Sequence, residues 1–252
     1  MKWIYKSMLA ALALLLFMFR NAFQQNLKSE TVELPAIQPF KPFRLMFISD
    51  IHRRTLHGNL AAHPVDMVII GGDLAEKGVP LSRIERNLQV LSELGALYFV
   101  WGNHDRHVGE EALRQLFKKY KVTVLENEWV TLFGNPRLKL AGLDYFIYEK
   151  DAVSKTFSGI ELEDTVLFVS HTPSIFKYVR ENYPADFLLA GHTHGGQIRL
   201  GRFGITEKGH FRETNGKIEL VSNGYGTTKL PLRLDAEAQY HIYTIRPKSS
   251  DS

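Results

Sequence analysis

The segment Phe187-Leu-Leu-Ala-Gly-His-Thr-His-Gly-Gly-Gln197 ends a short apolar run at a glycine and then places two histidines one residue apart. The run at 187–190 predicts a buried strand, and Gly191 allows a sharp turn at its carboxyl end. Because alternate side chains of extended backbone point to the same side, we expect His192 and His194 to converge on one metal ion. Two ordinary polar loop residues would give the same pattern, so this interpretation depends on partners elsewhere in the chain.

The composition limits the kinds of protein and of site. The chain of 252 residues is 44% hydrophobic, which is enough for one sizeable globular domain with an appendage. It contains no cysteine, so disulfides, thiolate nucleophiles and cysteine-held zinc are excluded, and any metal must be held by His, Asp, Glu or Asn. The formal charge of +4 suits an anionic partner or a membrane surface, but the basic residues are scattered and no nucleic-acid partner is expected.

The amino-terminal segment has the pattern of a targeting or anchoring sequence. Lys2 and Lys6 precede an uninterrupted apolar run at 8–19, which ends at Arg20. The twelve residues of this run are too few to span a bilayer. Residues 3–5 would extend the apolar helix if Lys6 reached to the lipid headgroups.

The sequence favours retention of this segment in the mature protein. A cleavage site at Ala22 would place Arg20 where a small residue is required. We therefore favour a single uncleaved membrane anchor at 1–25, with a removed signal peptide and a buried globular helix as the alternatives. Basic residues before the apolar run slightly outweigh those after it, which favours a location of the rest of the chain outside the cytoplasm.

A polar stretch follows, with prolines at positions 35, 39 and 42 and no sustained periodicity. This pattern predicts a linker. The chain is accordingly divided into an anchor at 1–25, a linker at 26–42, a globular domain at 43–247 and a tail at 248–252.

From residue 43 onward, apolar runs of strand length alternate with helical patterns. Strands are expected at 43–49, 65–70, 96–101, 165–169 and 187–190, and helices at 81–91, 111–120, near 150–156 and at 174–182. Closely spaced runs at 121–126, 128–133 and 137–143 predict antiparallel pairing, and further short strands are expected at 197–200, 218–221, 232–234 and 240–245. The alternation indicates an α/β fold with two packed mixed sheets flanked by helices and with ligands at the carboxyl ends of the strands.

Polar residues follow five of the expected strands. In chain order they are Asp50 and His52; Asp73; Asn103, His104 and Asp105; His171; and His192 with His194. One such residue alone is more often a cap or turn residue than a ligand. Successive strand ends of this kind, with no thiol among them, indicate a metal site.

This set resembles the calcineurin-like metallophosphoesterase family. The family pattern is matched, in order, by Asp50-Ile51-His52, Gly72-Asp73, Gly102-Asn103-His104-Asp105, His171 and Gly191-His192-Thr193-His194. The Gly-His-Thr-His-Gly-Gly-Gln form looks most like a bacterial branch with amino-terminal anchors or signal sequences. That branch includes cell-wall-associated phosphatases and is similar to enzymes that split the diphosphate of a nucleotide-linked lipid precursor. The resemblance implies a four-layer α/β/β/α sandwich.

The resemblance also implies a role for each matched residue. One divalent cation would be held by Asp50, His52 and His194, a second by Asn103, His171 and His192, and the carboxylate of Asp73 would bridge them. The two cations, for which Mn, Fe and Zn suit these ligands, would present a bridging hydroxide for attack on phosphorus. His104, oriented by Asp105, would act at the leaving group as a general acid or charge stabiliser. The two histidines of the opening segment are thereby assigned to different cations.

Arg53 and Arg54 directly follow His52 and are expected either to contact an anionic substrate or to form a solvated face. The histidines outside the motifs are expected on the surface or in the core; they are His57, His63, His107, His210 and His241. We expect a membrane-anchored dinuclear phosphoesterase that acts on a phosphorylated small molecule or on a lipid-linked substrate. The sequence does not indicate the oligomeric state. The alternatives are a pyrophosphatase acting on a nucleotide-linked lipid precursor and a catalytically silent binding scaffold.

Overall fold

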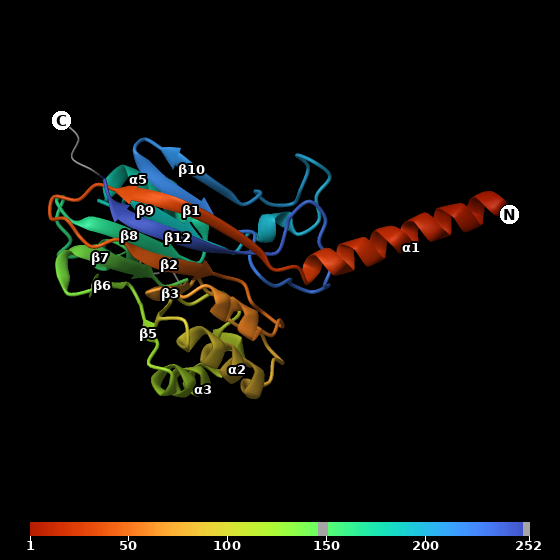
Figure 1. The fold of residues 1–252 in the computed structure, drawn as a ribbon, viewed down its shortest axis with the longest axis horizontal. Helices are drawn as coiled ribbons and strands as arrows, with labels where there is room; N and C mark the ends of the chain where they lie inside the picture. Colours follow the sequence, from red (N-terminus) through yellow and green to blue (C-terminus); the bar gives the residue numbers. More distant parts are fainter. Residues whose placement is uncertain (146–150, 249–252) are drawn as a thin grey trace.

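The computed structural model describes residues 1–145 and 151–248 and contains two β-sheets with helices on their outer faces (Figure 1). The first sheet is formed by β1 (Asn26–Leu34), β2 (Phe43–Ile48), β3 (Met67–Ile70), β4 (Ala96–Phe99), β5 (Thr123–Val124) and β12 (Gln239–Pro247). The second is formed by β6 (Glu128–Leu132), β7 (Asn135–Leu143), β8 (Thr165–Ser170), β9 (Phe187–Ala190), β10 (His210–Thr214) and β11 (Lys217–Val221). The α-helices are α1 (Lys2–Ala22), α2 (Leu81–Ser92), α3 (Arg106–Lys119), α4 (Ala152–Thr156) and α5 (Phe176–Asn182), and 3-10 turns occur at Gly58–Ala62, Pro173–Ile175 and His194–Gly196.

Both sheets are mixed. The first has the order β1-β12-β2-β3-β4-β5, in which β2 to β5 are mutually parallel and β12 is antiparallel to β2. The second has the order β10-β11-β9-β8-β7-β6, in which β7, β8, β9 and β11 are parallel and the two outer strands are antiparallel to their neighbours. This arrangement confirms the two mixed sheets expected from the sequence.

The alternation of side chains along β2 shows how each sheet is buried on both faces. Leu45 and Phe47 pack in the cluster between the sheets, with residues of β8 and β9. Met46 and Ile48 point the other way and pack with apolar residues of α2 and α3. Residues of α4 and α5 cover the outer face of the second sheet in the same manner. The four layers of helix, sheet, sheet and helix are therefore those predicted.

The segment 26–42, predicted to be a linker, contains a nine-residue strand. β1 runs parallel to β12 from Asn26 opposite Gln239 to Leu34 opposite Pro247. Its last residues, Val32 and Leu34, are buried between the sheets. The strand was missed because its partner comes from the other end of the chain and most of its side chains are not buried. The irregular part of the predicted linker is confined to 35–42.

Three further expectations for the strands need correction. Of the three runs expected to pair antiparallel, the second and third do so, as β6 and β7, whereas the first forms β5 and pairs in parallel with β4. The segments 197–200 and 232–234 are not strands; they share one isolated parallel bridge between Ile198 and Leu234. β10 was not predicted, because its side chains are not buried and show little apolar alternation. Residue 150 of the helix expected near 150–156 and residues 249–252 of the expected tail lie outside the described residues.

α1 is a helix of 21 residues that projects from the domain (Figure 1). It is exposed on every face along most of its length, and its buried residues are Met18 and Ala22, near its carboxyl end. At a rise of about 1.5 Å per residue it is roughly 30 Å long, which is the thickness of a bilayer's hydrocarbon core. α1 is thus long and apolar enough to be a membrane anchor or a signal sequence.

Candidate metal centre

The candidate ligands lie in turns that follow β2, β3, β4, β8 and β9. β3, β8 and β9 are buried throughout, β2 is buried in all but one residue, and β4 is buried at Leu97 and Phe99. Each turn begins within a few residues of the end of its strand. Because the strands are parallel within their sheets, their carboxyl ends meet at one edge, where the two sheets face each other. Residues that are far apart in the sequence are thereby brought together.

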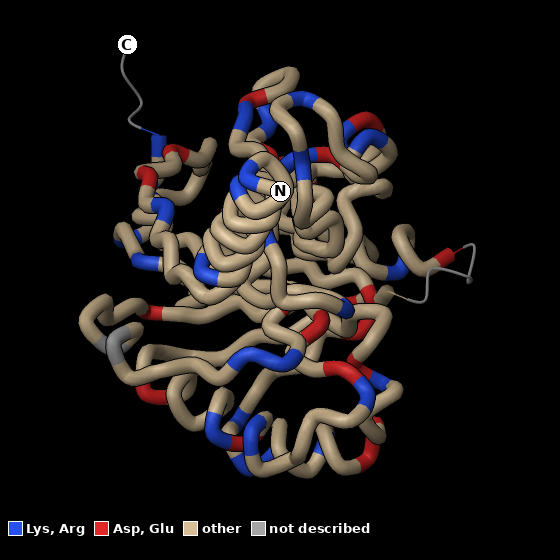
Figure 2. The backbone as a smooth tube through the Cα atoms, turned by 90° about the vertical axis from the view of Figure 1, so that its right-hand side faces the viewer, with Lys and Arg blue, Asp and Glu red and all other residues tan. Residues whose placement is uncertain are grey.

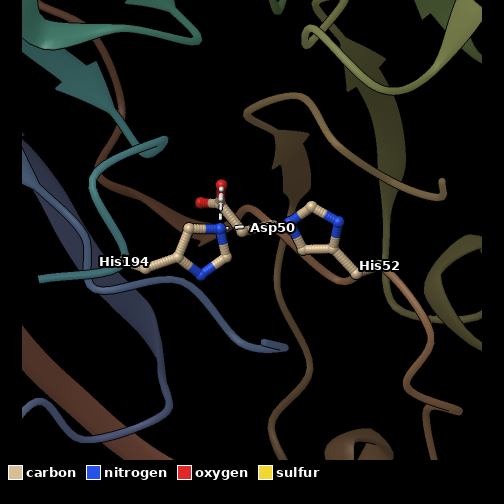
Figure 3. A group of neighbouring side chains, drawn as sticks. All are labelled: Asp50, His52 and His194. Atoms are coloured by element: carbon tan, nitrogen blue, oxygen red, sulfur yellow. Dashed lines mark hydrogen bonds and ion pairs between the residues drawn. The ribbon is translucent and has the colours of Figure 1, made fainter. Parts of the chain in front are cut away.

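The first group of ligands consists of Asp50, His52 and His194, and all three are buried (Figure 3). Nε2 of His52 lies 3.1 Å from Nε2 of His194, which in turn lies 3.4 Å from Oδ1 of Asp50. Ligand atoms held about 2.1 Å from one ion at angles between tetrahedral and octahedral are about 3.0–3.4 Å apart. The donor spacing therefore fits a single coordination sphere.

The second group lies beside the first. Nε2 of His171 lies 3.1 Å from Oδ1 of Asn103 and 3.0 Å from Nδ1 of His192. Oδ2 of Asp73 lies 3.3 Å from Nε2 of His171 and 3.7 Å from Nε2 of His52, so this one oxygen faces both groups. The structure thus places the predicted ligands in two adjoining sets that share Asp73.

The contacts of two ring nitrogens determine which nitrogen faces the centre. Nδ1 of His171 lies 2.9 Å from the carbonyl oxygen of Gly71, to which it must donate its hydrogen, so the lone pair of Nε2 points into the centre. Nδ1 of His52 lies 3.1 Å from Oε2 of Glu76, an ion-pair contact that places a carboxylate beside the nitrogen turned away from the centre. Sequence reasoning missed Glu76; the available signal was a lone glutamate in the turn after Gly72-Asp73.

The charges of the centre also suit a cation. Burial raises the pKa of Asp73, but the neighbouring His171 outweighs it, so the pKa lies well below its usual range and the group is ionised. Burial lowers the pKa of His194 to about 3, so this imidazole is neutral and offers a lone pair. For His171, burial lowers the pKa but the Asp73 carboxylate raises it, to about 9. A proton and a divalent cation therefore compete for the same nitrogen.

Several ligands have a left-handed main chain, which residues other than glycine rarely adopt. Their φ angles are 54° for Asp50, 51° for His52, 51° for Asp73, 70° for His192 and 50° for His194. Glycines make room for the carboxylates, since a Cβ on Gly191 would collide with Asp50 and one on Gly102 would collide with Asp73. Such conformations cost about 1–2 kcal/mol each and cluster at functional sites.

The structure gives Asp105 a different role from the predicted one. Its carboxylate is fully buried and accepts main-chain N–H groups from Asp73 at 2.8 Å, Gly102 at 2.7 Å and Ala75 at 3.2 Å. Both oxygens are engaged by the main chain, which corrects the expectation that Asp105 orients the ring of His104. Asp105 instead joins the turns after β3 and β4. The prediction failed because the position of Asp105 next to His104 in the sequence does not determine which way its side chain points.

His104 lies at the edge of the centre and is partly exposed. Its main-chain N–H donates to Oδ1 of Asp73 at 2.8 Å, and its ring centroid lies 5.2 Å from that of His52. The ring of His104 therefore lies beside His52 of the first set, and its main chain contacts the shared Asp73.

The guanidinium of Arg54 is held by main-chain carbonyls. Its buried guanidinium donates to the carbonyl oxygens of Phe23 at 3.0 Å, Gln24 at 2.9 Å and Tyr225 at 2.7 Å. The Cζ atom also lies 3.9 Å from the ring centroid of Tyr225. These partners hold the chain that leaves α1. Arg54 is buried, so it does not form a solvated face, and it lines the same cavity as Arg53.

Arg53, in contrast, is exposed and forms an ion pair with Glu76. It lines a cavity of about 450 Å³ together with His57, Arg83 and Arg86. Nη1 of Arg83 donates to the carbonyl oxygen of Arg53 at 2.8 Å, which fixes the two side by side. Glu76 contacts both Arg53 and His52, and so links this basic cavity to the first set of ligands.

Comparison with known proteins agrees with this geometry. A family model described as "Calcineurin-like phosphoesterase" matches residues 43–196. The "Uncharacterized protein YpbG" of Bacillus subtilis (strain 168) is 40% identical over 242 residues, which cover 94% of this chain and 93% of that protein. "Phosphodiesterase YaeI" of Escherichia coli (strain K12) is 29% identical over 221 residues, covering 81% of this chain and 74% of its own.

Among solved structures, a putative 5'-nucleotidase from Staphylococcus aureus has a TM-score of 0.51 and 10% identity, over 84% of this chain and 56% of that chain. This likeness shows the fold alone. The family match contains all of the ligand turns described above, and with the extended identity to YpbG it establishes that the chain belongs to the calcineurin-like phosphoesterase family.

Proposed function

We propose that this protein is a membrane-anchored, dinuclear metal-dependent phosphoesterase that hydrolyses a phosphate ester or a diphosphate. The observation that carries the proposal is the pair of ligand sets that share Oδ2 of Asp73, each with donors at the spacing of one coordination sphere. Imidazole, carboxylate and amide donors suit Mn, Fe or Zn. Membership of the family supports the phosphoesterase chemistry.

The chain's own residues have distinct tasks in this proposal. Asp50, His52 and His194 hold one cation, and Asn103, His171 and His192 hold the other. Two divalent cations held there supply a water of lowered pKa and neutralise the phosphoryl oxygens. Asp73 lies between the two ligand sets. His104 lies beside Asn103 and supplies a proton, or positive charge, to the leaving oxygen. Asp105 keeps the turns that carry Asp73 and Asn103 in register.

The basic cavity favours a diphosphate as the second candidate substrate. Four arginines, Arg53, Arg54, Arg83 and Arg86, line it, and Glu76 connects Arg53 to His52 of the first ligand set. The second phosphate group of a diphosphate, which is not the one attacked, would need guanidinium groups as partners in place of the cations. A pyrophosphatase acting on a nucleotide-linked lipid precursor meets this description, and Arg53 then binds the anionic part of its substrate.

We further propose that α1 is retained as the anchor and that the domain lies outside the cytoplasm. A helix that is apolar on all faces is stable in lipid rather than in water. Its carboxyl end is tied to the domain, since the main-chain N–H of Arg233 donates to the carbonyl oxygen of Met18 at 3.0 Å. A topology reporter fused after residue 252 tests the side of the membrane, and activity of the reporter in the cytoplasm would contradict this assignment.

The function is tested with the full-length protein in detergent. After loading with Mn, Fe or Zn, bound metal is counted and hydrolysis of an aryl phosphate monoester, a phosphodiester and a diphosphate is measured. We expect about two equivalents of metal and turnover of at least one substrate, with both lost in Asp73→Asn. Less than about one equivalent, together with no turnover, would refute the proposal in favour of a silent scaffold.

A further inference from the structure

The loop between β9 and β10 exposes a group of large apolar side chains. Leu200 is 73% exposed, Phe203 is 68% exposed and Ile205 is 89% exposed, and Leu230 in the loop before β12 is 62% exposed. We call these four residues the docking face. Neighbouring apolar side chains that stay exposed on a fixed framework mark an interaction surface.

The framework of the loop is built around Arg199. This side chain is buried, and its guanidinium donates to three main-chain carbonyls, those of Gly195 at 2.9 Å, Arg202 at 3.0 Å and Thr206 at 2.7 Å. The main chains of Leu200 and Phe203 exchange two hydrogen bonds, at 2.9 and 3.1 Å. The polar groups of the loop are thus turned inward and its apolar side chains outward, which is the reverse of an ordinary surface loop.

Gln197 joins this loop to its neighbour. Its Nε2 donates to the carbonyl oxygen of Leu230 at 2.9 Å, and its Oε1 accepts the main-chain N–H of Thr228 at 3.0 Å. The main-chain N–H of Leu234 also donates to the carbonyl oxygen of Gln197 at 3.0 Å. The two loops therefore form one unit, and the docking face belongs to this unit.

The same unit is connected to α1 and to the metal centre. The neighbouring Arg233 donates through its main-chain N–H to Met18 of α1 at 3.0 Å, and through its guanidinium to the carbonyl oxygen of His194 at 3.2 Å. Figure 1 shows the loops after β9 on the side of the domain from which α1 projects, and Figure 2 shows α1 pointing out of that side. The docking face, the ligand turn at His194 and the anchor thus share one end of the molecule.

The charges around the docking face suit an anionic surface. Segments 195–206 and 224–234 contain four basic residues and neither Asp nor Glu. Two of these basic residues, Arg202 and Lys229, are exposed beside the apolar side chains. Apolar side chains flanked by basic ones are typical of segments that lie in the interface of a membrane with anionic lipids.

We propose that the docking face inserts into the headgroup region of the same bilayer that α1 crosses, so that the metal centre faces the membrane surface. The proposal rests on the membrane anchoring proposed above and adds an orientation to it, since an anchor alone would let the domain turn away. It also narrows the substrate class to phosphate esters or diphosphates that are carried by the membrane, because these lie at the height of the centre.

The absence of cysteine from the chain permits single spin labels at chosen positions. The full-length protein carries one label through Phe203→Cys, Ile205→Cys or Leu162→Cys and is reconstituted into liposomes that contain phosphatidylglycerol. Leu162 is a matched control, because it is 86% exposed, close to the 89% of Ile205, but precedes β8 and so lies at the opposite edge of the sheet. Power saturation compares the access of oxygen and of a water-soluble nickel chelate to each label.

We expect labels at 203 and 205 to be reached by oxygen more than by nickel, and the label at 162 to show the reverse. A label at Leu230→Cys should become accessible to nickel when Phe203→Ser and Ile205→Ser are combined with it. Equal nickel access at 205 and 162 would overturn the proposal. Hydrolysis of a soluble aryl phosphate and cosedimentation with the liposomes are measured on the same samples, so failure of the phosphoesterase or of the anchor is recognised separately.

Discussion

Replacement of Glu76 is expected to weaken one cation site and to spare the other. Oε2 of Glu76 lies 3.1 Å from Nδ1 of His52, and the glutamate side chain is only 10% exposed. The hydrogen bond from His52, helped by that from Arg53 and opposed by burial, lowers the pKa of Glu76 to about 2. The carboxylate is therefore ionised and increases the basicity of the nitrogen that faces the centre.

The size of the effect follows from what each replacement removes. Glu76→Gln keeps a hydrogen-bond acceptor for His52 but loses the charge, whereas Glu76→Ala loses both and frees the ring to rotate. Loss of such an outer partner costs about 10- to 100-fold in metal affinity, or roughly 1.4–2.7 kcal/mol. We expect about 10-fold for glutamine and about 100-fold for alanine, each in one of the two sites.

Competition between the full-length protein and a fluorescent chelator for Zn or Mn resolves the two binding steps. Glu85→Gln is the matched control, because Glu85 lies on α2 and pairs with Lys119, on the side away from the centre. Only one step should weaken in the Glu76 variants, and neither should change in the control. Equal weakening of both steps, or no change in Glu76→Ala, would refute the idea that Glu76 acts through His52.

Other substitutions separate the remaining roles. Arg53→Ala should raise KM for a diphosphate by about tenfold without changing stability. Arg54→Ala should lower the free energy of unfolding by about 3 kcal/mol, because three carbonyls lose their donor. Steady-state kinetics and urea titration in detergent distinguish the two effects. His104→Ala should lower kcat by about 100- to 10,000-fold with both metals retained, and an emptied site would contradict its assignment to the leaving group. Burial lowers the pKa of His241 from 6.5 to about 3. The unfolded chain therefore binds the extra proton between these values, and stability falls as the pH drops below 6.5, by about 2.7 kcal/mol near pH 4.5. His241→Asn should remove this contribution, and an unchanged difference between urea titrations near pH 7 and pH 4.5 would exclude it.

The ligand turns could be predicted because each is a local feature. Gly72-Asp73 follows an apolar run that is buried whatever its partners are, and the turn residues follow directly from the end of the strand. The alternation of strand-length and helical patterns likewise predicted two packed sheets flanked by helices, and the side chains of β2 are buried on both faces. Such features can be predicted from the local sequence, because the apolar run and the turn residues that define them are adjacent in the chain.

The supporting contacts could not be predicted, because folding brings their partners together. Glu76 gains its role from His52, which lies on a different turn. Arg54 was expected either at the substrate or on a solvated face, but its partners include carbonyls at the end of α1. β1 was read as a linker for the same reason, since its hydrogen-bonding partner is the last strand of the domain. Each error concerns a residue whose neighbours in space are distant in sequence.

The strained ligand backbones show why motifs that are ambiguous alone are informative as a set. The main-chain N–H of Asp50 donates to the carbonyl oxygen of Gly72 at 3.0 Å, that of His52 to Asp73 at 3.2 Å, and that of His192 to the carboxylate of Asp50 at 3.1 Å. A neighbouring turn thus holds the left-handed conformation of each turn. The free-energy cost of that conformation is not offset by contacts within a single turn. A single polar residue at a strand end needs no neighbouring turn to hold its conformation. A group of turns that hold one another by hydrogen bonds requires all of the turns to be present. The candidate metal centre is therefore a property of the group of turns, and a substitution in any one of them should change the positions of ligands in the others.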